Sequence, residues 1–304
     1  MIQYKLILND ILYGPLVLEK DTRTGIKTKS ISGVQFEHDM RDGFPLLTTK
    51  KMSIKNIAVE LEFFIKGLND KKWLQERGCH IWDEWANPKK AEKLKWDLIH
   101  MSDRFNLLDP EFQQKEAQKS TMDLGRIYGV QWRDWKSCVK KTSGLKEYSI
   151  DQLALIIDRA KANPLDRRLI VSAWRPDEIT QMALPPCHYA WQILSDGFYL
   201  DLIWVQRSVD IGLGLPYNIA SYGLLLLLLA KELDLVPRRL VGQLGDTHIY
   251  ENHEEKLVEQ MGREAFPLPT VNILNFTNIF DWTYRDIELL NYQHHPKIEL
   301  EIAV

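Results

Sequence analysis

The segment YAWQILSDGFYLDLIWV, residues 189–205, sets the expected fold class. Its two halves, 189–194 and 199–205, are short and rich in aromatic and branched aliphatic residues, as β-strands are. Asp196 and Gly197 stand between the halves and give a strong hairpin signal. Similar short runs at 167–174 and 240–244 predict further strands. We therefore expect the middle of the chain to form a β-sheet.

Helices are expected on both sides of these strands. Residues 51–67 place apolar side chains at helical spacing, with Glu60 beside the apolar face. Residues 150–162 form a second predicted helix, for which Ser149 and Gln152 match a capping box.

A third predicted helix, at about 219–233, contains six successive leucines and is expected to be buried on all sides. Helices and strands do not alternate strictly, as they would in a doubly wound sheet. We therefore expect an α+β fold, with one large domain over residues 1–304, a mixed β-sheet and flanking helices. The charged segment 88–122 is predicted to be a helical insertion on the surface.

Composition excludes several classes of protein. The formal net charge of -3 argues against a general nucleic-acid binder, which is usually basic. Cys79, Cys138 and Cys187 form neither a disulfide framework nor a metal-binding spacing, so no metal and a reducing, cytoplasmic setting are expected. Apolar runs fall short of the ~20 residues of a membrane span.

Cys187 is the strongest candidate nucleophile. It follows Pro185 and Pro186, which restrict the backbone in front of the thiol. A lone cysteine is usually an inert small hydrophobe. Here Arg207 follows at the end of the next predicted strand pair, and a guanidinium near a thiol favours the nucleophilic thiolate.

Arginines at strand ends form a candidate phosphate site. Arg23, Arg167, Arg168 and Arg207 each stand in a fairly apolar stretch, and Ser208 adds a hydroxyl donor. They either form separate surface ion pairs of small energetic value or converge on a phosphate, whose oxygens match guanidinium geometry. The residue pattern leaves both interpretations open.

Three further polar residues have two interpretations each. Asn218 precedes the leucine-rich helix and is either a helix cap or a group that pairs with the edge of a pyrimidine. His248 and Tyr250 alternate onto one face and either bind sugar hydroxyls or are satisfied core polar groups.

Nine motifs, in order along the chain, resemble the thymidylate synthase family. They are DTRTG (21–25), DGFPLLTTKK (42–51), IWDEWA (81–86), YGVQWRDW (128–135), DRRLIVSAW (166–174), ALPPCH (183–188), QRSVD (206–210), GLPYNIASY (214–222) and GDTHIY (245–250). The resemblance covers nearly the whole chain. It implies that family's α+β fold, a sheet-to-sheet homodimer, and the reductive methylation of dUMP to dTMP.

The resemblance also implies a mechanism. Cys187 adds to C6 of dUMP, and C5 then takes the methylene group of 5,10-methylenetetrahydrofolate. C5 loses its proton, and the folate returns a hydride and leaves as dihydrofolate. Glu60 matches the carboxylate that organises proton transfer, Tyr128 the residue near the C5 proton, and Asn218 the residue that holds the uracil edge.

The remaining matches are ligands of the nucleotide and the folate. Arg23, Arg207 and Ser208 match phosphate ligands, Arg167 and Arg168 reach the phosphate of the partner subunit, and Gln206, His248 and Tyr250 match further nucleotide ligands. The folate contacts match Trp82, Trp85, Leu184, Asp210, Gly214, Tyr217 and Val304, with Asp210 also counted among the catalytic residues and Val304 in a tail that closes over the folate.

Several positions depart from the family's usual pattern: Glu62, Arg175, Ala190, Trp191, Val205 and Gly212. One interpretation is that the core repacks, with three residues smaller and Trp191 larger. The other is that Glu62 or Arg175 places a water near the site. Water would then replace the hydride and the product would be 5-hydroxymethylated dUMP, as in related nucleotide hydroxymethylases, mostly of phages.

A third hypothesis is a non-catalytic nucleotide- or RNA-binding protein on the same fold, using the basic pairs Lys50–Lys51 and Arg238–Arg239. The joint presence of Cys187, Glu60, Tyr128 and Asn218 favours an enzyme instead. The expected location is the cytoplasm, or the host cytoplasm if the chain is phage-encoded.

Overall fold

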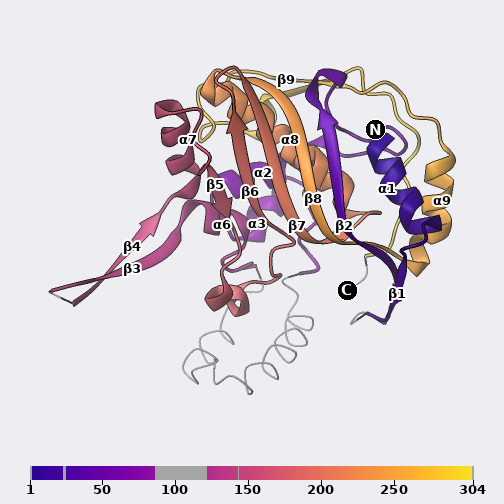
Figure 1. The fold of residues 1–304 in the computed structure, drawn as a ribbon, viewed down its shortest axis with the longest axis horizontal. Coiled ribbons are helices and arrows are strands. Elements are labelled where there is room, and N and C mark those ends of the chain that lie inside the picture. Colours follow the sequence, from indigo (N-terminus) through magenta and orange to yellow (C-terminus); the bar gives the residue numbers. More distant parts are fainter. Residues whose placement is uncertain (1, 23–24, 86–121, 143, 303–304) are drawn as a thin grey trace.

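The computed structural model describes residues 2–22, 25–85, 122–142 and 144–302. A six-stranded sheet has the order β1-β2-β8-β7-β6-β5, with helices packed against it (Figure 1). The strands are β1 Leu18–Lys20, β2 Thr28–Asp39, β3 Trp135–Lys141, β4 Gly144–Ile150, β5 Ile170–Ser172, β6 His188–Ser195, β7 Tyr199–Asp210, β8 Val236–Tyr250, β9 Thr270–Ile273 and β10 Ile287–Leu290. The α-helices are α1 Ile2–Tyr13, α2 Ile54–Ile65, α3 Lys71–Gln75, α6 Tyr128–Arg133, α7 Gln152–Ala162, α8 Gly214–Leu233 and α9 Glu254–Gly262.

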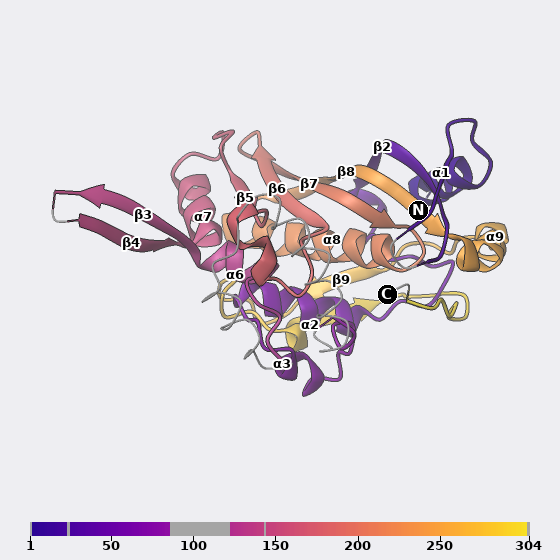
Figure 2. The same ribbon diagram turned by 90° about the horizontal axis from the view of Figure 1, so that it is seen from below.

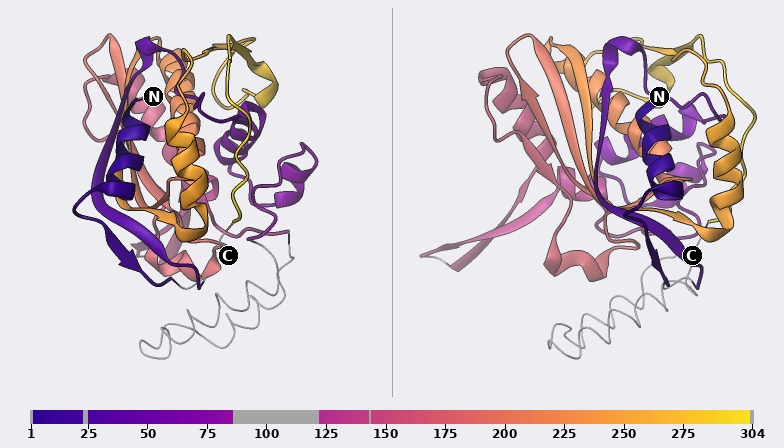
Figure 3. Two further views of the ribbon diagram at one scale, coloured as in Figure 1. Left: turned by 90° about the vertical axis from the view of Figure 1, so that its right-hand side faces the viewer. Right: turned by 45° about the vertical axis from the view of Figure 1, so that its right-hand side comes forward.

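The helices gather on one side of the six-stranded sheet. Helix α8 lies along that face, and α2 lies on the far side of α8 (Figure 2). Side views show α1 and α9 on the same side, and no described helix on the opposite face (Figure 3). Strands β7 and β8 are parallel, whereas the other neighbours in this sheet are antiparallel. The predicted α+β class with a mixed sheet is thereby confirmed.

The predicted hairpin at Asp196 and Gly197 joins β6 to β7. The Asp196 carboxylate accepts the backbone N–H groups of Phe198 at 3.0 Å and Tyr199 at 2.8 Å. Gly197 has a φ of 93°, which glycine adopts without strain. Strand β7 continues past the predicted end at residue 205 to Asp210, so the QRSVD motif lies within the strand.

Helix α8 begins at Gly214, five residues before the predicted start at 219. Pro216 is compatible with this position because the first helical turn needs no N–H donors. The Asp210 carboxylate accepts the N–H groups of Gly212 and Leu213 in the turn that leads into the helix. Asn218 is therefore inside the helix, and its interpretation as a helix cap is wrong.

The predicted capping box of α7 is also wrong. Asp151 is the N-cap, and its side chain accepts the N–H of Ala154 at 3.0 Å. Ser149 belongs to β4 and donates to Asp134. The Gln152 amide donates to the carbonyls of Gln131 and Ser172, both at 2.8 Å, and so does not cap the helix.

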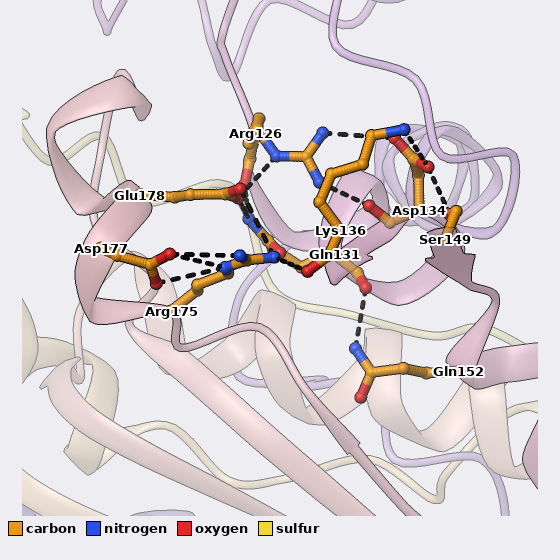
Figure 4. Close-up of polar contacts among 9 residues, drawn as sticks. All are labelled: Arg126, Gln131, Asp134, Lys136, Ser149, Gln152, Arg175, Asp177 and Glu178. Carbon is orange, nitrogen blue, oxygen red and sulfur yellow. Dashed lines mark hydrogen bonds and ion pairs between the residues drawn. The ribbon is translucent and has the colours of Figure 1, made fainter. Parts of the chain in front are cut away.

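The β3–β4 hairpin projects from the body of the molecule (Figure 1), and a polar network lies at its base (Figure 4). Buried Glu178 accepts hydrogen bonds from Arg126 and from the Gln131 amide, and it forms an ion pair with Arg175 at 3.5 Å. A buried carboxylate needs such partners to offset its lost hydration. Arg175 also donates to the backbone carbonyl of Lys136 in β3, so the network ties the hairpin base to the 3₁₀ turn Pro176–Gln181.

Candidate active site

Cys187 is held directly in front of β6 by contacts with the end of β7. The backbone N–H of Arg207 donates to the Cys187 carbonyl at 2.8 Å. The Arg207 guanidinium donates to the carbonyls of Pro186 at 3.0 Å and Pro185 at 2.9 Å. Burial raises the pKa of the Cys187 thiol above its ordinary value, and the positive charge of Arg207 opposes that shift. Arg207 is thus placed to favour the thiolate.

Tyr128 and His188 form an aromatic stack beside the cysteine. The Tyr128 hydroxyl accepts the backbone N–H of Cys187 at 2.8 Å, and its ring stacks on His188 at a centroid distance of 4.2 Å. Nδ1 of His188 lies 2.9 Å from the Tyr222 hydroxyl. Burial lowers the pKa of His188 to about 3, so the imidazole is neutral at physiological pH.

Glu60 lies on α2, and its carboxylate accepts the indole N–H of Trp82 at 2.8 Å. Burial raises the pKa of Glu60 to about 7, against the smaller opposing effect of the Trp82 hydrogen bond. Burial raises the pKa of Tyr222, and the negative charge of Glu60 raises it further. A carboxyl group that titrates near neutral pH is suited to accept and return a proton during a reaction.

A hydrogen bond from Gln206 of β7 connects Asn218 of α8 to the sheet. The Gln206 amide nitrogen donates to Oδ1 of Asn218 and to the Ser208 carbonyl, both at 3.0 Å. His188 and Gln206 are direct neighbours in the register of β6 and β7. The cysteine, the stacked rings and the Asn218 amide are thus connected through adjacent strands.

Asp210, Gly214 and Tyr217 surround the start of α8. Buried Lys50 donates to the carbonyl of Gly212 in the same turn. Burial lowers the pKa of Lys50 to about 8, and the charge of Asp210 opposes the shift.

His248 and Tyr250 lie inside β8, which extends beyond the strand predicted at 240–244. Asp210 and His248 are neighbours in the β7–β8 register, and so are Ser208 and Asp246. The rings of His248 and Tyr250 meet edge to face, with centroids 5.3 Å apart. These residues therefore share one end of the sheet with Ser208.

Other predicted site residues lie elsewhere or outside the described residues. Arg167 and Arg168 are exposed in the loop before β5. Trp85 and Leu184 are partly buried against the hydrophobic core. Arg23, Val304 and all of the predicted insertion at 88–122 except Met122 lie outside the described residues.

The structure gives Glu62 and Arg175 partners that disfavour a role in placing water. Glu62 is buried, and its carboxylate accepts the N–H of Tyr284 at 2.8 Å and pairs with Lys66 at 3.1 Å. Arg175 contacts Asp177 and Glu178 in the network at the hairpin base. Both charges are therefore engaged away from Cys187.

The proposed compensation among the altered core residues is also wrong. Trp191 is buried against Trp132, with ring centroids 5.5 Å apart. Ala190 and Val205 pair across β6 and β7 and point to the opposite, uncovered face, because successive side chains alternate. Gly212 lies near Leu300 at the start of α8. The smaller residues therefore do not make room for Trp191.

Most members of the basic pairs are engaged by other groups. Lys50 is buried, Arg238 binds Asp201 at 2.7 Å, and Arg239 binds Glu37 at 2.8 Å, whereas Lys51 is exposed. The described part of the chain has no group of three or more metal-ligating side chains close enough to hold an ion. None of its helices combines the length and hydrophobicity that crossing a membrane requires.

Sequence reasoning did not select His188, Tyr222 or Trp204 as members of this region. Asn218 and Tyr222 are four residues apart on α8, and Trp204 and Gln206 are two apart on β7, spacings that place each pair on one face. These spacings are the feature of the sequence that could have identified Tyr222 and Trp204 as neighbours of Asn218 and Gln206.

The fold and the site define an α+β enzyme with a cysteine as its candidate nucleophile. The model of the family described as thymidylate synthase matches residues 2–304. A protein of Mesoplasma florum named thymidylate synthase is 43% identical over 307 residues, covering 100% of both chains. A protein of that name from Staphylococcus haemolyticus is 42% identical over 305 residues, covering 94% of this chain and 93% of its own length. The chain belongs to the thymidylate synthase family and is an enzyme of the methyltransferase class.

Proposed function

We propose that the protein methylates dUMP to dTMP, with 5,10-methylenetetrahydrofolate as donor of the carbon and the hydride. The observation that carries the proposal is the position of Cys187, held between Arg207 and the Tyr128 hydroxyl. Similarity along the full length to proteins named thymidylate synthase supports it.

In this proposal the Cys187 thiolate attacks C6 of the uracil ring and the electron pair moves toward C5. Arg207 favours the thiolate by its charge. An arginine has five N–H donors, and the contacts with Pro185 and Pro186 leave others for the nucleotide phosphate, together with Arg23 and Ser208. A neutral His188 adds no competing positive charge beside the base.

The nucleophilic C5 then bonds to the methylene carbon and afterwards loses its proton. Glu60 organises that proton transfer because its pKa lies near the working pH, and Tyr128 lies beside the C5 proton. Asn218, held by Gln206, pairs with the uracil edge. His248 and Tyr250 hold the ribose.

The folate supplies the carbon and the hydride when bound. The side chains proposed to contact it are Trp82, Trp85, Leu184, Asp210, Gly214, Tyr217 and Val304. Trp82 also holds Glu60, which links the folate side of the site to the proton-transfer group. The bond between Cys187 and C6 breaks when the hydride reaches the exocyclic methylene carbon, so the folate must stay in the site until that step.

We further propose a homodimer formed through the uncovered face of the six-stranded sheet. On that face Ala190 pairs with Val205 and Ile203 pairs with Val241, so that apolar side chains run across β6, β7 and β8 between Gln192 and Gln243. Such an apolar strip on an uncovered sheet favours burial against a partner. Arg167 and Arg168, exposed at the β5 edge, are then available to the partner's phosphate site.

Product analysis tests the reaction. Incubation with dUMP and 5,10-methylenetetrahydrofolate should give a nucleotide with the mass of dTMP and an equal amount of dihydrofolate, detected by absorbance. A product with one additional oxygen and no dihydrofolate would instead establish hydroxymethylation. Nucleotide binding without turnover would support the non-catalytic hypothesis.

A further inference from the structure

Trp204 lies where strand β7 and helix α8 face each other. Trp204 and Gln206 are two residues apart on the strand, which spans about 6.6 Å. Asn218 and Tyr222 are four apart on the helix, which spans about 6 Å. The two spacings match, so Gln206 meets Asn218 while Trp204 meets Tyr222.

A chain of hydrogen bonds runs from Trp204 to Asn218. The Trp204 indole N–H donates to Oε1 of Gln206 at 3.1 Å, and Nε2 of Gln206 donates to Oδ1 of Asn218 at 3.0 Å. An indole N–H only donates, so the amide oxygen of Gln206 must face it. The NH₂ group of Gln206 then faces Asn218, whose side-chain oxygen must accept the hydrogen bond. The direction of the first bond therefore sets the orientation of the second amide.

The indole itself is firmly placed. Trp204 is fully buried, and its ring stacks on Tyr222 at 5.3 Å with an angle of 8° between the planes. Its neighbour on β8 is Gly242, where an added Cβ would come within 2.5 Å of the indole ring. The absence of a side chain at Gly242 thus makes the space that the indole occupies.

We propose that Trp204 is a positioning residue for nucleobase recognition, which through Gln206 fixes the Asn218 amide in the orientation that suits uracil and opposes cytosine. Uracil presents an N3–H donor beside the O4 acceptor, whereas cytosine presents an N3 acceptor beside an amino donor. Oδ1 of Asn218 can accept from both Gln206 and N3–H while its NH₂ donates to O4. A flipped amide would suit cytosine but would set two NH₂ groups against each other at Gln206. The inference rests on the proposed function of Asn218 as the uracil ligand.

The test compares Trp204→Phe with Trp191→Phe. The first removes the indole N–H and keeps a ring beside Tyr222. The second is a matched control: Trp191 is buried, pairs with Trp204 across β6 and β7, and its indole nitrogen has no hydrogen-bond partner among the described residues. Calorimetry gives the dissociation constants of dUMP and dCMP, and kinetics give kcat/KM for dUMP.

Trp204→Phe should lower the preference for dUMP over dCMP by about three- to tenfold, the effect of one net hydrogen bond. Trp191→Phe should leave the preference unchanged, although both variants lose thermal stability. In a Gln206→Ala background, Trp204→Phe should cause no further change in preference, because the connection to Asn218 is already broken.

An unchanged preference for dUMP over dCMP in folded Trp204→Phe, or an equal change in Trp191→Phe, overturns the inference. Turnover of dUMP by the wild-type protein would still support the proposed function in that case. If the wild-type protein does not convert dUMP, the proposed function fails and the inference fails with it.

Discussion

Among single residues, Glu60 couples stability to catalysis. Burial raises its pKa from 4.5 to about 7. Between these pH values the folded protein holds a proton that the unfolded chain has released, so this group lowers stability as pH rises through the window. Glu60→Gln should therefore become more stable relative to wild type from pH 4.5 to 7, while kcat falls by about 100-fold or more.

Urea unfolding of both proteins at pH 5 and pH 8 measures this change. A constant difference in the free energy of unfolding at the two pH values would contradict the assigned burial effect. Retention of full kcat would remove Glu60 from the mechanism.

A second single residue, Arg207, controls the reactivity of Cys187. Burial raises the pKa of the thiol and the guanidinium opposes the rise, so Arg207→Ala should raise the pKa further. Alkylation by iodoacetamide at pH 8 should slow, as followed on the Cys187 peptide by mass spectrometry. Arg285→Ala, a change at an exposed arginine, serves as the control with an unchanged rate. An equal rate in Arg207→Ala would refute the electrostatic role.

At the scale of elements, Glu62 fastens α2 to the turn Tyr284–Asp286. Its buried carboxylate accepts the Tyr284 N–H and pairs with Lys66. Glu62→Ala should reduce stability by about 1–3 kcal/mol, because the backbone donor and the lysine lose their partner. The product from dUMP should remain the methylated nucleotide. A change of product would restore the hypothesis that Glu62 positions water.

Local patterns predicted the elements whose signals are local. The Asp196-Gly197 turn identified the β6–β7 hairpin, and the apolar spacing of 51–67 identified α2. The start of α8 was misplaced because Gly214 and Pro216 look like turn residues, although both are compatible with a first helical turn. The α7 cap was misassigned because Ser149 and Asp151 are both good caps, and pairing in the β3–β4 hairpin decides between them.

Long-range pairing left other elements unpredicted. Strand β2 pairs with the short strand β1 and, over most of its length, with β8, which lies 200 or more residues later. The β3–β4 hairpin depends on the network around Glu178, whose members come from separate parts of the chain. The pairing of β2 with β8 and the contacts of the network around Glu178 have no signal in the neighbouring residues.

At the scale of the whole molecule, the uncovered sheet face should hold two copies together. Ile203 lies in the middle of the apolar strip, paired with Val241. Ile203→Asp should convert the dimer to a monomer in sedimentation velocity and lower activity at least tenfold, because an unpaired charge would be buried in the interface. Leu145→Asp changes an exposed apolar residue on the projecting hairpin and should leave the dimer intact. A wild-type monomer with full activity would contradict the proposed assembly.

The candidate site was predictable to the extent that family motifs name its members. Cys187 contacts Arg207 and Gln206 contacts Asn218 in the structure, while the roles that the resemblance implies for them stay predictions. The resemblance did not reveal Trp204, because its role depends on a strand and a helix meeting with matched spacing. The resemblance also did not show that Glu62 contacts Tyr284 and Arg175 contacts Asp177, because the direction of a side chain is set only in the folded chain.

The central claim is a covalent bond between the sulfur of Cys187 and C6 of a uracil nucleotide. The most direct measurement uses 5-fluoro-dUMP with 5,10-methylenetetrahydrofolate, because fluorine at C5 cannot leave as a proton does and the adduct is trapped. We predict that mass spectrometry finds nucleotide and folate attached to the Cys187 peptide, and nothing attached in folded Cys187→Ser. Absence of the adduct from active wild-type enzyme, or its attachment at another residue, would contradict the account.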